Sequence, residues 1–199
     1  MLVNAFSDGA ARAAESLKIL ALGDSLTAGY NLPASAAFPV KLEAALKAKG
    51  HQVTVINAGV SGDTSAGGLA RLDWALAERP QAAIVELGAN DMLRGLDPAQ
   101  TFANLDAIIG RLKSQGVRVL LAGMKAPPNL GPFAGEFNAV YPRLADKHKV
   151  DLYPFFLEGV AARPDLNQGD GLHPTALGVE RIVEGILPKV RRLIDGLKG

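Results

Sequence analysis

Five short apolar runs divide the sequence from residue 17 onward. Each run is nearly continuous in Leu, Ile, Val and Ala rather than alternating with polar residues, which is typical of strands covered on both faces of a sheet. The runs span residues 17–23, 53–57, 82–88, 117–122 and 150–153. We therefore expect five buried strands.

Between these runs, apolar residues recur at helical spacing. Residues 102–112 carry them at the i, i+3, i+4 and i+7 positions of an amphipathic helix, and Gly116 follows as a stop signal. Residues 179–193 repeat the pattern near the C-terminus. Alternating strands and helices predict an α/β fold, a three-layer α/β/α sandwich around a five-stranded parallel sheet.

The length of 199 residues suits a single domain, to which we assign residues 17–199. Residues 1–16 are rich in Ala, and the small residues at 11–14 resemble the cleavage zone of a secretory leader. The charged start and long apolar stretch of a leader are missing. We therefore expect residues 1–16 to be either a disordered tail or the remnant of a leader. A leader remnant predicts a periplasmic or secreted protein, whereas a disordered tail is also compatible with a cytoplasmic protein.

Composition argues against several classes of partner. The net charge is +1 and the Lys and Arg residues are scattered, so nucleic acid is not an expected partner. The chain has no Cys, which excludes disulfides, thiolate metal sites and a Cys nucleophile. No apolar run approaches the roughly 18 residues of a membrane span, so stable membrane insertion is not expected. Nothing in the sequence indicates an oligomeric state.

Polar clusters follow each of the first three predicted strands. They are residues 23–25, 61–65 and 88–91, with the sequences GDS, SGDTS and GAND. In open parallel sheets, ligands bind beyond the carboxyl ends of the strands, where such clusters would meet. We expect the functional site at this edge of the sheet.

The best candidate for a catalytic base is His173. His51 and His148 lie in charged turns and are interpreted as solvated. His173 lies in the Gly-rich stretch 169–174, and Asp170 three residues earlier could orient its imidazole. The simpler interpretation of Asp170 is a helix-capping residue.

The best candidate for a nucleophile is Ser25, directly after the first strand. A serine hydroxyl attacks only when a base removes its proton. The surrounding sequence is not G-x-S-x-G, so this is not the nucleophile elbow of α/β-hydrolases, and a helix-capping serine is the simpler alternative. The N–H groups of Ser25 and Gly62 and the side-chain amide of Asn90 could stabilise an oxyanion, although alone Gly62 suggests a turn and Asn90 a loop cap.

These residues arrive in a recognisable order. The four blocks are Gly23-Asp24-Ser25-Leu26, residues 57–65 (NAGVSGDTS), Gly88-Ala89-Asn90-Asp91 and residues 170–174 (DGLHP). In this order the chain resembles the SGNH, or GDSL, hydrolases. More narrowly, it is similar to the bacterial arylesterase and multifunctional thioesterase/lysophospholipase branch. The resemblance extends from residue 17 to the C-terminus.

The resemblance implies a role for each block. It implies a flavodoxin-like sheet with Ser25 as nucleophile, His173 as base and Asp170 as the partner of the base. It implies an oxyanion hole from Ser25, Gly62 and Asn90. Each assignment agrees with the chemistry that the residue types suggest on their own.

The resemblance further implies that Asp24 and Asp63 brace the site by hydrogen bonds rather than react. It implies a serine esterase that cleaves short- to medium-chain acyl or aryl esters, acyl thioesters or lysophospholipids through an acyl-serine intermediate. The expected partner is a small-molecule ester or thioester, and no metal or organic cofactor is needed.

Specificity and two alternative functions remain open at this point. The apolar residues of 126–137 would either line an acyl pocket or pack beneath their own loop, and Met92, Leu93 and Leu96 would form another wall. One alternative is a carbohydrate acetylesterase, although the aromatic content of 6% argues mildly against a sugar-stacking groove. The other is a non-catalytic phosphate- or nucleotide-binding module, although residues 23–29 lack the Lys-Ser/Thr that ends a P-loop.

Overall fold

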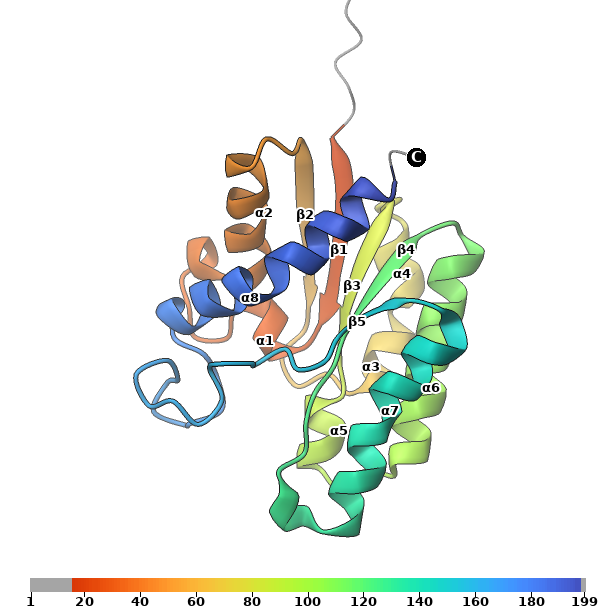
Figure 1. The fold of residues 1–199 in the computed structure, drawn as a ribbon, viewed down its shortest axis with the longest axis vertical. Helices are drawn as coiled ribbons and strands as arrows, with labels where there is room; N and C mark the ends of the chain where they lie inside the picture. Colours follow the sequence, from red (N-terminus) through yellow and green to blue (C-terminus); the bar gives the residue numbers. More distant parts are fainter. Residues whose placement is uncertain (1–15, 198–199) are drawn as a thin grey trace, which may run out of the picture.

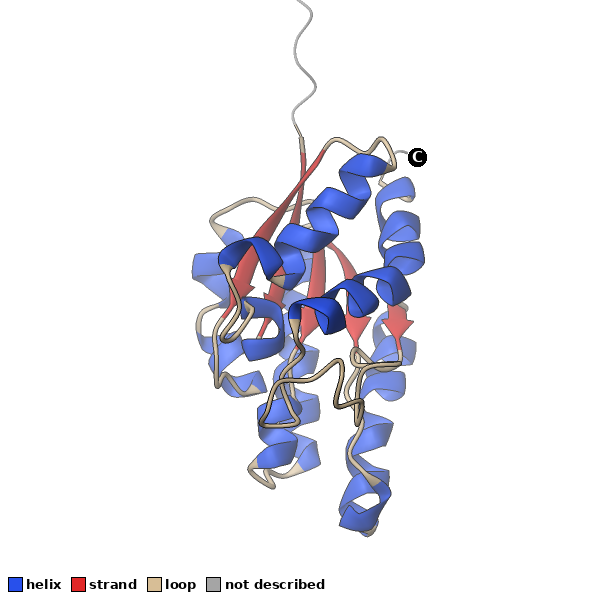
Figure 2. Cartoon of the chain, turned by 90° about the vertical axis from the view of Figure 1, so that its left-hand side faces the viewer, coloured by secondary structure: helices blue, strands red, loops and turns tan. Residues whose placement is uncertain are grey.

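The computed structural model describes residues 16–197 and contains the five parallel strands that the apolar runs predict. The sheet order is β2-β1-β3-β4-β5, the flavodoxin-like arrangement. The strands are β1 (Leu17–Gly23), β2 (Val53–Gly59), β3 (Ala82–Glu86), β4 (Arg118–Ala122) and β5 (Asp151–Tyr153). All their arrowheads point to one edge of the sheet, where loops gather (Figure 2).

Helices cover both faces of the sheet, as the predicted three-layer fold requires (Figure 1). On one face α2 (Phe38–Ala48) packs against α8 (Ala176–Asp195). On the other, α6 (Pro98–Ser114) packs against both α7 (Pro132–His148) and α3 (Ser65–Ala70). The remaining short helices are α1 (Ser25–Ala28), α4 (Leu72–Leu76), α5 (Ala89–Leu93), η1 (Ala34–Ala36) and η2 (Pro128–Leu130).

The two predicted amphipathic helices are present and longer than their apolar patterns. Helix α6 begins where the Asp97 side chain caps the Ala99 N–H, and the chain leaves it through Gly116 at φ +76°. Helix α8 begins at the cap Thr175 and buries an apolar stripe from Val179 to Ile194.

Strand ends differ from the prediction by one or two residues. Strand β3 ends at Glu86 rather than Gly88, because Gly88 adopts φ +114° and turns the chain into α5. Strand β2 continues to Gly59, paired with Gly23 of β1. Since Gly23 also pairs with Glu86 of β3, the ends of the three strands lie side by side at the carboxyl edge.

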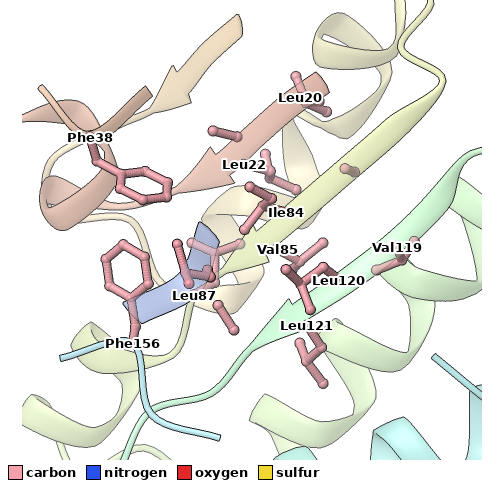
Figure 3. Packing of buried hydrophobic residues seen from close by; sticks show 14 of the residues in the cluster. Leu20, Leu22, Phe38, Ile84, Val85, Leu87, Val119, Leu120, Leu121 and Phe156 are labelled. Carbon is pink, nitrogen blue, oxygen red and sulfur yellow. The ribbon is translucent and has the colours of Figure 1, made fainter. Parts of the chain in front are cut away.

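The hydrophobic core lies on the central strands β1 and β3. Residues 19–22 and 82–85 have no exposed surface. Figure 3 shows Leu20 and Ile84 within this packing and, at its border, the rings of Phe38 and Phe156, which pack edge to face. A fully buried side chain of this size contributes about 1.5–3 kcal/mol relative to an exposed one. The packing of the central strands therefore fixes the positions of the segments that follow them.

Residues 154–175 form a long connection between β5 and α8 without a regular helix or strand; an isolated bridge pairs Asn167 with Pro174. None of the helices within residues 16–197 has the length and apolar character needed to span a bilayer. The leader or tail expected at 1–16 lies almost entirely outside the described residues, so it stays a prediction, as do the one-domain assignment of residues 17–199 and the cellular location.

Candidate active site

Ser25 lies where β1 ends and α1 begins. Asp24 caps α1 by accepting the Leu26 N–H at 2.9 Å, which fixes the turn that carries the Ser25 hydroxyl. The turn needs glycine at 23, because a Cβ there would lie 2.1 Å from the Thr27 hydroxyl oxygen. Ser25 is the first residue of α1, and the capping alternative is wrong for it, because the cap is Asp24 and the Ser25 hydroxyl bonds to another partner.

That partner is His173, which the fold brings to Ser25 from the other end of the chain. His173 Nε2 lies 2.9 Å from Ser25 Oγ, and its Nδ1 lies 2.7 Å from Asp170 Oδ2. The three side chains thus form one hydrogen-bonded series. Its geometry rests on a direct bond between residues that are 148 positions apart in sequence.

Asp170 both caps its turn and holds the imidazole. One oxygen, Oδ1, accepts the N–H groups of Leu172 at 2.9 Å and His173 at 3.0 Å, while Oδ2 faces the ring. These bonds, led by that from the His173 N–H, lower the pKa of Asp170 to about 2. Asp170 therefore closes a turn and orients the imidazole, and it is ionised near neutral pH; it is not a helix cap, because Thr175 caps α8.

The other two histidines have different environments. His148 was predicted to be solvated, but its side chain is only 14% exposed and its Nε2 lies 2.7 Å from Asp106 Oδ1, between α7 and α6. The packing of these two helices, which the local sequence does not reveal, is the reason for the difference. His51 lies half-buried after α2, where its N–H donates to the Leu46 carbonyl.

The three predicted oxyanion donors also reach this edge of the sheet. Gly62 adopts φ +85°, a conformation that favours glycine. Within residues 16–197 the N–H groups of Ser25 and Gly62 donate to no protein group. Asn90 Nδ2 donates to Asp24 Oδ2 at 3.2 Å and to the Asp63 carbonyl at 2.9 Å. The Asn90 amide is therefore held firmly, and both of its hydrogens are engaged.

A pair of buried carboxyl groups, Asp24 and Glu86, lies beneath Ser25. Burial raises the pKa of Asp24 to about 6, against the opposing effects of the Leu26 N–H and of His173. Burial also raises the pKa of Glu86 well above its usual value, and the nearby Asp24 adds to this. Glu86 Oε2 accepts the Thr27 hydroxyl at 2.7 Å. Beneath Ser25, burial therefore destabilises the ionised form of both carboxyl groups.

Two arginines connect the strand ends. Arg71 donates through Nε to Asp63 Oδ2 at 2.6 Å and through Nη2 to the Gly23 carbonyl at 2.9 Å. Arg94 Nη2 donates to the Gly62 carbonyl at 2.8 Å. The segments that carry Ser25, Gly62 and Asn90 are therefore tied together by side chains as well as by the sheet.

A cavity of about 110 Å³ opens beside Ser25 and His173. Its apolar lining comes from Leu26, Ala89, Met92, Leu93, Met124, Leu157 and Leu172. Of the predicted walls, Met92 and Leu93 line it, whereas Leu96 does not. The residues of 126–137 do not line it either; Phe137 is fully buried and packs against Phe133 and Tyr141. Within residues 16–197, no three His, Asp or Glu side chains gather as metal ligands.

Sequence reasoning missed Arg71, Glu86 and Gln168, all of which hold parts of this site. Glu86 offered a signal, because a carboxyl group inside an apolar strand needs a buried partner. The signal for Arg71 was weaker: it is a single cationic residue six positions after the block of residues 57–65. Gln168 offered none, because its partners depend on the path of the long connection.

The fold and the site define a class. A flavodoxin-like sheet carries a serine, a histidine and an aspartate in one hydrogen-bonded series at its carboxyl edge, the arrangement of a serine hydrolase. Residues 21–181 match the model of the GDSL-like lipase/acylhydrolase family. The chain belongs to this family and is a carboxylic ester hydrolase.

Relatives extend over nearly the whole chain. It is 45% identical over 161 residues to an arylesterase of Vibrio mimicus, covering 80% of each protein. It is 41% identical over 186 residues to thioesterase 1/protease 1/lysophospholipase L1 of Escherichia coli K12, covering 92% of this chain and 88% of that protein. The crystal structure of TesA superposes with a TM-score of 0.85 at 42% identity, covering 88% of this chain and 99% of that one.

Proposed function

We propose that the enzyme hydrolyses short- to medium-chain acyl esters, aryl esters and acyl thioesters through an acyl intermediate on Ser25. The observation that carries this proposal is the series Ser25 Oγ, His173 Nε2 and Asp170 Oδ2, with successive distances of 2.9 and 2.7 Å. The names of the relatives, arylesterase and thioesterase among them, support the same substrate classes.

His173 is the general base. Asp170 accepts a hydrogen bond from the Nδ1–H group, which leaves the Nε2 lone pair facing the Ser25 hydroxyl. As Ser25 Oγ attacks the acyl carbon, its proton passes to Nε2, and the carbonyl oxygen takes up the negative charge. His173 then gives this proton to the departing alcohol or thiol, and water hydrolyses the acyl-enzyme by the same route.

The developing oxyanion is stabilised by the free N–H groups of Ser25 and Gly62 and by the amide of Asn90. Asp24 and Asp63 brace the site by accepting the Asn90 amide, which limits its rotation. One Asn90 hydrogen must turn from these acceptors, or be shared with them, when the oxyanion forms. Arg94 supports the arrangement by holding the Gly62 carbonyl.

The cavity sets the size of the acyl group. A volume of about 110 Å³ compares with about 30 Å³ for one water molecule in the liquid, so a chain of a few carbon atoms fills it. Leu93 and Leu172 are 56% and 50% exposed at its rim, and a longer chain or an aryl group would lie across them. The aliphatic lining does not favour the carbohydrate alternative, for which aromatic stacking surfaces are expected.

A chain-length series tests the proposal. Nitrophenyl esters from acetate to dodecanoate are compared with an acyl thioester, using wild type, Ser25→Ala and the exposed control Ser35→Ala. We expect kcat/KM to peak at a short or medium chain, the thioester to compete with the esters, and only Ser25→Ala to abolish both activities. Hydrolysis of either substrate class by Ser25→Ala at the wild-type rate would contradict the proposal.

A further inference from the structure

The two halves of the proposed catalytic site reach each other from different parts of the fold. Ser25 stands on the short turn after β1, whereas His173 stands on the connection of residues 154–175. A hydrogen bond between Ser25 and His173 needs both segments to be held at the correct separation. The side chain of Gln168 lies between them.

Gln168 joins these segments through the nitrogen of its side-chain amide. Its Nε2 donates to the Tyr30 carbonyl and to the Pro174 carbonyl, each at 2.9 Å. Tyr30 follows Ser25 on the nucleophile segment, and Pro174 follows His173 on the base segment. The side chain therefore bridges the two segments through one nitrogen and both of its hydrogens.

The main chain completes a closed ring of hydrogen bonds. The Tyr30 N–H donates to the Ser25 carbonyl at 3.1 Å, and the Gln168 N–H donates to the His173 carbonyl at 2.7 Å. Together with the Gln168–Tyr30 and Ser25–His173 bonds, this ring passes through both reacting residues. The Tyr30 ring also lies against the imidazole, with the ring centroids 4.5 Å apart.

We propose that Gln168 is a positioning residue that sets the separation of Ser25 Oγ and His173 Nε2 by tying the His173 connection to Tyr30. This inference rests on the proposed function. Proton transfer is sensitive to distance, and a displacement of about 1 Å can cost about 10²-fold in rate. Glutamine suits the position because it offers two hydrogens to two carbonyl oxygens, whereas Glu or Met of similar size offers none.

Two substitutions of similar volume test the proposal. Gln168→Met removes the donors without adding charge, and Gln168→Glu places a carboxylate against two carbonyl oxygens. Gln100→Glu, at an exposed position on α6, is the matched control. Because loss of the ring weakens the base and not the acyl pocket, we expect kcat to fall about 10-fold in Gln168→Met and further in Gln168→Glu, with KM within about threefold of wild type.

The measurement separates positioning from folding. Rates are normalised to the folded fraction from circular dichroism, at a temperature well below the unfolding midpoint of each variant. The rate of Ser25 phosphonylation by a fluorophosphonate probe is measured in parallel and should fall with kcat. If both Gln168 variants keep the wild-type kcat and the wild-type rate of phosphonylation per folded molecule, the positioning role of Gln168 is wrong. If Ser25→Ala is inactive in the same experiment, the proposed function still stands. An active Ser25→Ala would overturn the proposed function itself.

Discussion

The proposed nucleophile half of this site, around Ser25 and Asn90, and the proposed base half, around His173 and Asp170, are held by different means. Ser25 and Asn90 follow central strands whose residues 19–22 and 82–85 are fully buried, and the adjacent Asp24 has no exposed surface. His173 stands on a connection without regular structure, and its partner Asp170 keeps 39% of its side chain exposed. The first half is fixed mainly by packing, and the second by hydrogen bonds, both within its own turn and from Gln168 to Tyr30.

This difference predicts how the two halves respond to substitution. Changes beneath Ser25 disturb a packed region with buried carboxyl groups, so they alter stability and activity together. Changes on the connection of residues 154–175 remove hydrogen bonds at a partly exposed surface, so they alter activity more than stability. The substitutions below test this contrast in order of decreasing effect.

The largest effect is expected at the base half. His173→Ala should lower kcat by on the order of 10⁵–10⁶, because no other group takes the Ser25 proton. Asp170→Asn should cost on the order of 10⁴, since the imidazole stays present but loses its orienting carboxylate. Aryl acetate turnover gives the rates, and His51→Ala is the control. Thermal unfolding midpoints of the two variants should stay within a few degrees of wild type; equal rate losses at 170 and 173 would mean that Asp170 does more than orient.

A smaller effect is expected at the oxyanion donor of the nucleophile half. Asn90→Ala should lower kcat roughly 10²–10³-fold with little change in KM, because the missing hydrogen bond forms fully only in the transition state. Asn129→Ala changes an exposed asparagine on η2 and serves as the control. A loss below about fivefold would show that the Asn90 amide serves Asp24 and Asp63 and not the oxyanion.

The smallest effect concerns stability and pH. Because the pKa of Asp24 is about 6 in the folded protein against 3.8 as its usual value, the folded state binds more protons between these pH values. The free energy of unfolding should therefore fall as pH rises from about 4 to 7, by up to about 3 kcal/mol for this group. Asp24→Asn does not titrate, so its stability relative to wild type should increase over the same window.

Urea unfolding at pH 4.5 and pH 7.5 measures this difference, with the exposed helix cap Asp97→Asn as the control. Asp24→Asn should also lose activity, because Asn90 Nδ2 then faces an amide in place of a carboxylate. If the difference in the free energy of unfolding between wild type and Asp24→Asn does not change with pH, burial does not raise the pKa of Asp24 in the folded protein.

The sequence predicts the sheet, and the meeting of the candidate site residues at one edge of it, for one physical reason. Continuous apolar runs identify buried strands, and polar residues directly after them must meet at one edge of a parallel sheet. Ser25, Gly62 and Asn90 are found by this rule, and Asp170 by its short spacing from His173. The four ordered blocks further indicated the family.

Contacts that depend on the path of a loop are not visible in the sequence. Gln168 bonds to Tyr30 across 138 positions, and nothing local to either residue signals that pairing. The engagement of both Asn90 hydrogens likewise depends on how two strand ends meet. The wall of the cavity was predicted only in part, because Phe137 turns inward to pack with Tyr141.

The most direct test is to identify the residue that acts as the nucleophile, by trapping it with a phosphonylating reagent. The enzyme is treated with a fluorophosphonate, digested, and its peptides are mapped by mass spectrometry. We expect one phosphonyl adduct per chain on Ser25, no adduct in Ser25→Ala, and much slower labelling in His173→Ala. The contradicting result is an adduct on a residue other than Ser25 that forms equally in wild type and in Ser25→Ala and that abolishes ester hydrolysis by the wild-type enzyme.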